Sequence, residues 1–291
     1  MLDPAPVSLL SLADGEVRIL ERPLLEGVTT PQLLVGGFVT INNGQLSMRD
    51  PTLPLVSLTG GTHYVALFPG TAMFDFQGPA TRVQAGGLLH ASGARISGEQ
   101  AVRLVDRALL EATAPLIKLV AGSTMTSNSD LVKLVQNARL TGTVPSDALV
   151  MLNASALNVN GSLFNVAGGS SLNVTGNLVS LTNGSTLTLT NGALVSVSGG
   201  SAFNLTGSFG SFGTGTNAIT LPTTDVFGGH AHTINTSLIP GYGVALGNGA
   251  ASSQVTVGGG FTPFTGTGGT NTVTPGGIVL HVDDTSHAVL R

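Results

Sequence analysis

The side chains that could do acid, base or metal chemistry are few and scattered along the chain. Only 9% of the 291 residues are charged, and between residues 148 and 282 the only charged residue is Asp225. Cleavage of a polysaccharide needs two carboxyl groups close together on one face, one as general acid and one as base or nucleophile. Apart from Asp283-Asp284, in an expected terminal turn, the carboxylates occur singly. We therefore expect no catalytic residues and no enzymatic activity.

The histidines offer one short motif, His230-Ala-His232. It could place two imidazoles on one side of a strand, which is the minimum of a metal site. The preceding Gly228-Gly229 favours a loop, however, and no third ligand is close in sequence. Cysteine is absent, and no Gly-rich segment is followed by the lysine and helix of a phosphate-binding loop. We expect neither a metal site nor a cofactor.

One cluster could line a groove for sugars. Tyr64, Phe74 and Phe76 lie close together in sequence, with Asp75 between the two phenylalanines. If the protein binds or cleaves carbohydrate, this is where we expect the groove.

The elements that position these residues come from a repeated phrase. Between residues 116 and 208 a strand-length run with a leading leucine returns six times, followed each time by a second run. The leading leucines, which follow one another at a short and nearly constant spacing, are Leu116, Leu131, Leu149, Leu163, Leu178 and Leu194. A unit this short cannot bury a face alone and must stack on copies of itself. The sequence therefore predicts a solenoid.

Within each run, apolar and polar residues alternate with period two. In Thr186-Leu-Thr-Leu-Thr190 the leucines share one side and the threonines the other, as in a strand with one buried face. The same frame turns Arg103, Lys118 and Lys133 outward. Outward Asn158, Asn173 and Asn204 favour side-chain ladders that bond from coil to coil.

The leading leucines break this alternation, because each has the parity of an outward residue. Either the chain bends after each leucine, so that the leucine still reaches the core, or the six leucines form an exposed stripe that contacts a partner. Phe261 and Phe264, in a Gly- and Thr-rich segment, are expected to cover an open edge. The candidate assembly or contact residues are therefore the six leading leucines and these two phenylalanines.

Three regions differ in regularity. Residues 1–97 predict irregular coils and an end cap, residues 98–208 the regular solenoid, and residues 209–291 loops with a terminal coil of the same domain. Residues 98–112 suit a helix by composition, but they align with the repeat, and we predict two strands there.

The repeat permits two packings. One 15-residue unit could form a flat coil with two sheets, or one and a half units could form a triangular rung of about 22 residues. Strand starts taken three apart recur at nearly the length of the triangular rung, and this spacing favours it. The pairs of starts are Leu157 and Leu178, Leu163 and Leu187, and Leu172 and Leu194.

Composition excludes several classes of partner. The net charge of -4 offers no basic field for nucleic acid, and no stretch is long and apolar enough for a membrane span. The N-terminal residues lack the basic and apolar regions of a signal peptide.

The repeat phrase at residues 178–192 resembles the β-helical repeats of bacterial surface exoproteins of the filamentous haemagglutinin and autotransporter passenger type. The resemblance covers residues 1–208 and the last coil. It implies an all-β fold, a right-handed parallel β-helix, and secretion to the bacterial cell surface.

From this resemblance and the scarcity of charge we expect a non-enzymatic structural or adhesive protein, either a filament subunit or a stalk segment of an adhesin. Its partner would be a second copy bound end to end, or a glycan or protein at a cell surface. The alternative is a carbohydrate-binding or polysaccharide-cleaving β-helix.

Overall fold

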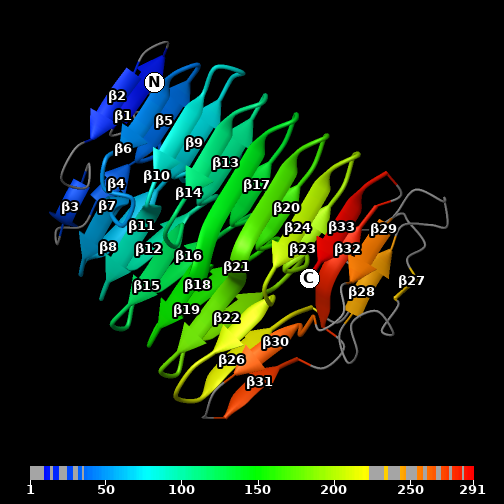
Figure 1. Ribbon diagram of the computed structural model, residues 1–291. Helices are drawn as coiled ribbons and strands as arrows, with labels where there is room; N and C mark the ends of the chain where they lie inside the picture. Colours follow the sequence, from blue (N-terminus) through cyan, green and yellow to red (C-terminus); the bar gives the residue numbers. More distant parts are fainter. Residues whose placement is uncertain are drawn as a thin grey trace.

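The computed structural model describes residues 10–13, 16–19, 25–28, 32–34, 36–222, 233–234, 243–246, 254–257, 261–266, 270–274, 277–283 and 285–291. The regular elements among them are all β-strands, which stack as a parallel β-solenoid of about seven turns (Figure 1). The predicted all-β solenoid is therefore confirmed. In these ranges no helix is long and apolar enough to cross a membrane.

The strands form three sheets, which we name A, B and C, and sheet B has two arms that meet at a bend. In stacking order, sheet A contains β1 (Leu10–Ala13), β5 (Val39–Asn42), β9 (Phe74–Gln77), β13 (Val102–Val105), β17 (Val132–Leu134), β20 (Phe164–Val166), β23 (Val195–Val197), β32 (Ile278–Val282), β28 (Gly243–Leu246) and β27 (Thr233–Ile234). Sheet C contains β4 (Gln32–Leu34), β8 (Thr62–Val65), β12 (Arg95–Gly98), β16 (Thr124–Ser127), β19 (Ala156–Val159), β22 (Thr186–Leu189), β26 (Asn217–Thr220) and β31 (Asn271–Val273).

Sheet B is the largest of the three. Its first arm contains β2 (Glu16–Ile19), β6 (Gln45–Met48), β10 (Arg82–Ala85), β14 (Leu109–Ala112), β24 (Ala202–Thr206), β33 (His287–Leu290) and β29 (Gln254–Val257). Its second arm contains β3 (Leu25–Val28), β7 (Pro54–Thr59), β11 (Gly87–Ser92), β15 (Ile117–Val120), β25 (Gly210–Phe212) and β30 (Phe264–Gly266). Two long strands, β18 (Arg139–Asn153) and β21 (Ser171–Thr182), run through both arms.

One coil passes through sheet A, the first arm, the second arm and sheet C before it returns to sheet A. Along sheet A, Val102 pairs with Val132, Val132 with Phe164, and Phe164 with Val195. Each of these steps is about twice the spacing between successive leading leucines, so a coil contains two of the repeated units. Both packings considered from the sequence, a 15-residue flat coil and a 22-residue rung, are wrong, because a coil has four strand segments where the triangular rung would have three.

The strands themselves lie where the alternation predicts them. In β22 the leucines of Thr186–Leu189 are buried and Thr186 is exposed. Residues 98–112 form the end of β12, then β13 and β14, so the prediction of strands over a helix is confirmed. Arg103, Lys118 and Lys133 occupy outward, half-buried positions between buried neighbours.

The bend between the arms of sheet B is tight, and glycine makes it possible. Gly176 has φ +111°, and a Cβ atom there would collide with the carbonyl oxygen of Val144 on the preceding coil. In β18 the pairing with β21 shifts between Val144 and Ala148, so residues 145–147 have no counterpart in β21. This insertion accounts for the longer spacing between Leu131 and Leu149.

The six leading leucines all lie in the core. Leu116, Leu149 and Leu178 precede the second arm, Leu131, Leu163 and Leu194 precede sheet A, and each is 0% exposed. The chain bends at these positions, so a residue with outward parity in the strand still points inward. The expected alternative of an exposed leucine stripe is therefore corrected, because these side chains present no surface to a partner.

Polar side chains bond from one coil to the next at the turns and on the outer faces. The amide of Asn204 donates to Asn173 at 2.7 Å, which confirms that part of the predicted ladder. Asn158 instead lies exposed in an outward column of sheet C, between the half-buried Thr126 and Thr188. Buried serines add a second ladder, in which the backbone N–H of one turn donates to the hydroxyl of the next: Ala138 to Ser170, Ser170 to Ser201, and Ser201 to Ser286.

The last strands are stacked out of chain order. β32 pairs with β23 on one edge and with β28 on the other, although β28 precedes it in sequence. In the same way β33 lies between β24 and β29 (Figure 1, where the red strands separate yellow-green from orange). The chain therefore moves outward by three levels from β26 to β27, steps back by one level to β28 and β29, and returns by one more level between β29 and β30.

Candidate functional site

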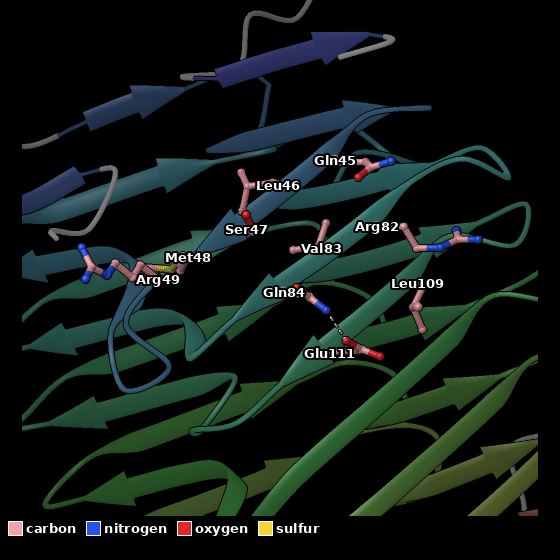
Figure 2. A pocket seen from close by; sticks show the side chains of 10 residues that line it. All are labelled: Gln45, Leu46, Ser47, Met48, Arg49, Arg82, Val83, Gln84, Leu109 and Glu111. Carbon is pink, nitrogen blue, oxygen red and sulfur yellow. Dashed lines mark hydrogen bonds between the residues drawn. The ribbon is translucent and has the colours of Figure 1, made fainter. Parts of the chain in front are cut away.

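The outer face of the described coils has open depressions, and one of them lies on the first arm of sheet B. It has a volume of about 530 Å³ and spans β6, β10 and β14 (Figure 2). Its outward side chains come from two columns, one of Gln45, Arg82 and Leu109 and one of Ser47, Gln84 and Glu111. The register of three successive parallel strands brings these residues together.

Polar contacts fix the side chains of this depression. The amide Nε2 of Gln84 donates to Oε2 of Glu111 at 2.8 Å across one coil step (Figure 2). The guanidinium of Arg82 donates to the carbonyl oxygens of Pro79 and Thr81 at 3.0 and 2.8 Å. The face can therefore offer amide, guanidinium and carboxylate groups to a polar ligand.

This depression has a single carboxylate in its lining, Glu111. Two further depressions, which we call the second and the third, also have one each. Glu99 lines the second, on sheet A, and Asp147 lines the third, on the second arm of sheet B. Hydrolysis of a glycosidic bond uses two carboxyl groups about 5–10 Å apart. These three depressions thus provide polar groups for binding. None of their linings contains the second carboxylate that glycosidic hydrolysis would need.

The groove predicted from aromatic residues does not form. Phe74 and Phe76 are 0% exposed in the core, because the inward positions of β9 require large apolar side chains. Asp75 lies between them on the outer face of sheet A, where both of its oxygens accept hydrogen bonds from Arg103 at 2.9 and 2.6 Å. Tyr64 is exposed, but it belongs to β8 of sheet C. The four residues therefore do not meet, and this prediction is wrong.

The remaining sequence candidates divide between the end of the solenoid and the undescribed residues. Asp225, His230, His232 and Asp284 lie outside the described ranges. Within those ranges, no group of three or more His, Asp or Glu residues could hold a metal ion. Asp283 accepts the backbone N–H of Gly199 at 2.5 Å, and thereby fixes the turn of the last coil to the turn below it.

Phe261 and Phe264 lie at the C-terminal end of the stack, partly buried against the core. Phe261 meets Phe209 edge to face, with ring centroids 5.7 Å apart, and Phe264 lies 6.1 Å from Phe212. The two rings extend the core by one level. Aromatic pairs in such geometries stabilise the packing. Their role as contacts to a partner stays a prediction.

One titratable group on the outer face was missed from the sequence. His90 on the second arm lies next to Lys118 of the following coil, and both line the third depression. Burial lowers the pKa of His90, and the positive charge of Lys118 lowers it further. The length of one coil, had it been known, would have placed these two residues side by side.

This pair predicts a pH dependence of stability. Because the pKa of His90 is lower in the folded state than the ordinary value of about 6.5, the unfolded state binds the proton more readily. The contribution is present above the ordinary value and is lost as the pH falls through the folded-state pKa. We expect the urea midpoint of unfolding to fall between about pH 7.5 and pH 5, and to fall less in His90→Gln. An equal fall in both proteins would contradict this assignment.

No family model, no curated protein and no solved structure matches the chain. The fold and the surfaces described above are therefore the basis for a function.

Proposed function

We propose that this protein is a non-enzymatic structural segment of a bacterial surface protein, either a filament subunit or a stalk segment of an adhesin of the filamentous haemagglutinin or autotransporter passenger type. The observation that carries the proposal is the combination of a continuous apolar core with outer faces that become uncharged toward the C-terminal end. In the described coils from β19 to β26, the outward columns hold Asn, Ser, Thr and Ala. Outer faces of this kind favour a structural role for the solenoid.

The ends of the stack offer the contacts that a filament needs. The edge of a parallel sheet presents unpaired N–H and C=O groups, and natural proteins protect these edges with charges, prolines or covering segments. In the second half of the chain, from residue 148 to residue 282, Asp225 is the only charge, and charged residues return at Asp283, Asp284 and Arg291. This scarcity of charge supports contact between ends, with a second copy as the partner.

Electron microscopy across a concentration series tests the proposal. Nine described strands of sheet A run parallel, so the described stack is about 4 nm long at about 4.8 Å for each strand step. At a urea concentration below the main unfolding transition, which loosens strands at the end of the stack, we expect particles that lengthen with concentration at constant width, in steps of one molecule. Discrete particles of one length at every concentration, with and without urea, would contradict a filament and would leave a stalk segment or lateral binding.

Carbohydrate binding is the second candidate function, and the depression of Figure 2 favours it. Its amide, guanidinium and carboxylate groups are of the kinds that hydrogen-bond sugar hydroxyls. Binding on a glycan array that is lost in a Gln84→Ala, Arg82→Ala double variant would support this candidate. Release of reducing ends from a polysaccharide would support cleavage instead.

A further inference from the structure

The four outermost strand positions of the regular stack form one complete coil, although the chain builds it out of order. β32 continues sheet A, β33 the first arm, β30 the second arm and β31 sheet C. Hydrogen bonds fix this coil to the coil below it. Gly199 donates to Asp283, Gly200 donates to the hydroxyl of Thr285 at 2.7 Å, and Asn217 donates to Asn271 at 3.0 Å.

Strands β28 and β29 cover only half of this coil. β28 pairs with β32 and β29 with β33, whereas no described strand lies beyond β30 or β31. The difference shows in the burial of the inward side chains. Leu280 and Val282 of β32 and Ala288 and Leu290 of β33 are buried, while Phe264 of β30 and Val273 of β31 are only partly buried.

The uncovered half presents apolar groups as well as strand edges. Phe261, Phe264 and Val273 lie there and are only partly buried against the core. On the covered half, β27 pairs with β28 in the antiparallel direction, so it ends the parallel ladder of sheet A. Among the described strands, the parallel stack is thus blocked on sheet A, and none continues it beyond β30 on the second arm or β31 on sheet C.

The opposite end has the complementary form. β1, β2, β3 and β4 supply one strand to sheet A, to each arm of sheet B and to sheet C, and no described strand pairs with their outer edges. This first coil therefore matches the complete last coil strand for strand. Because the two ends differ, their contact is heterologous and generates an open chain of molecules.

We propose that the strands β27, β28 and β29 form an assembly cap, and that release of this cap allows the first coil of a second copy to pair with the complete last coil. The contact is strand addition at a sheet edge, with main-chain hydrogen bonds supplying affinity. This inference rests on the proposed end-to-end assembly and specifies its surfaces and its control.

A disulfide that locks the cap tests the proposal. Thr256 of β29 and Val289 of β33 are register partners in the same outward column, and neighbouring strands place Cα atoms about 4.8 Å apart, within the range of a disulfide. The chain contains no cysteine, so Thr256→Cys, Val289→Cys introduces one defined pair. The matched control is Thr141→Cys, Asn173→Cys, a register pair between β18 and β21 inside the stack.

The readout is the mass distribution in sedimentation velocity, at a urea concentration below the main unfolding transition. We expect the reduced cap variant to form polymers that grow with concentration and the oxidised cap variant to keep the monomer mass. The control pair should polymerise in both redox states. Equal polymerisation of the oxidised cap variant would overturn the cap and leave end-to-end assembly standing.

Two further outcomes have distinct meanings. If no variant polymerises in either redox state, the proposed end-to-end assembly fails together with its cap. If the control pair oxidises but the cap pair does not, the pairing of β29 with β33 is overturned, and the inference with it.

Discussion

Gly176→Ala is expected to lower the free energy of unfolding by about 3–5 kcal/mol. The residue lies at the bend between the two arms of sheet B with φ +111°, a conformation that side chains with a Cβ atom rarely adopt. The added methyl would also meet the carbonyl oxygen of Val144 on the preceding coil. Backbone is the obstacle here, so the clash cannot be relieved by rotating a side chain. Urea unfolding followed by circular dichroism measures the loss.

The control separates steric collision from backbone strain. Gly122 also has positive φ, +79°, but a Cβ atom there has no other atom within 4 Å. Gly122→Ala should therefore cost only about 1–2 kcal/mol. Equal effects at the two positions would show that coils do not approach each other closely at the bend.

Leu178→Ala is expected to lower the free energy of unfolding by about 2–5 kcal/mol. The side chain is 0% exposed in the core, so truncation removes buried apolar area and leaves a cavity. If the leading leucines formed a surface stripe, the same change would cost well under about 1 kcal/mol. The unfolding midpoint in urea therefore decides between the two interpretations of the repeat.

Leu109 provides the matched control for this prediction. It lies in the same sheet, at a half-buried outward position of β14. Leu109→Ala should change the free energy of unfolding by less than about 1 kcal/mol. A loss as large as that of Leu178→Ala would contradict the inward and outward assignment of sheet B.

The individual strands could be predicted from the sequence because strand formation depends on local alternation. In Thr186–Leu189 the period of two identifies the buried face without knowledge of any other segment. The Asn173 and Asn204 contact was also accessible, since outward residues of equivalent strands in successive coils stack. Local patterns of this kind carry their information within a short stretch of chain.

The number of strands in a coil could not be predicted in the same way. A repeated unit of the observed length is compatible with coils of two, three or four strands, because the angle at each bend of the chain is set by packing between coils. The bend at Gly176 depends on contact with Val144, which lies one full coil earlier in the chain. Whether Leu178 faces the core or the solvent could not be predicted for the same reason. Its side chain points inward only because the chain bends there.

The aromatic groove failed because local clustering does not reveal which sheet each strand joins. Tyr64 and Phe74 are close in sequence, yet a turn places them on sheets C and A. Likewise, the return of the repeat at residues 278–290 predicted a terminal coil, but the sequence contains no signal that β28 and β29 lie beyond it. Only the register of β32 and β33 reveals that order.

Hydrogen exchange measured by mass spectrometry tests this account most directly, because the half-capped end requires β32 and β33 to lie inside the stack. We expect amides in residues 278–290 to exchange as slowly as those in residues 195–206, and those in residues 254–257 to exchange faster, since among the described strands β29 pairs on one edge only. Faster exchange in residues 278–290 than in residues 254–257 would contradict the account, because it would place the last strands at the outside of the solenoid.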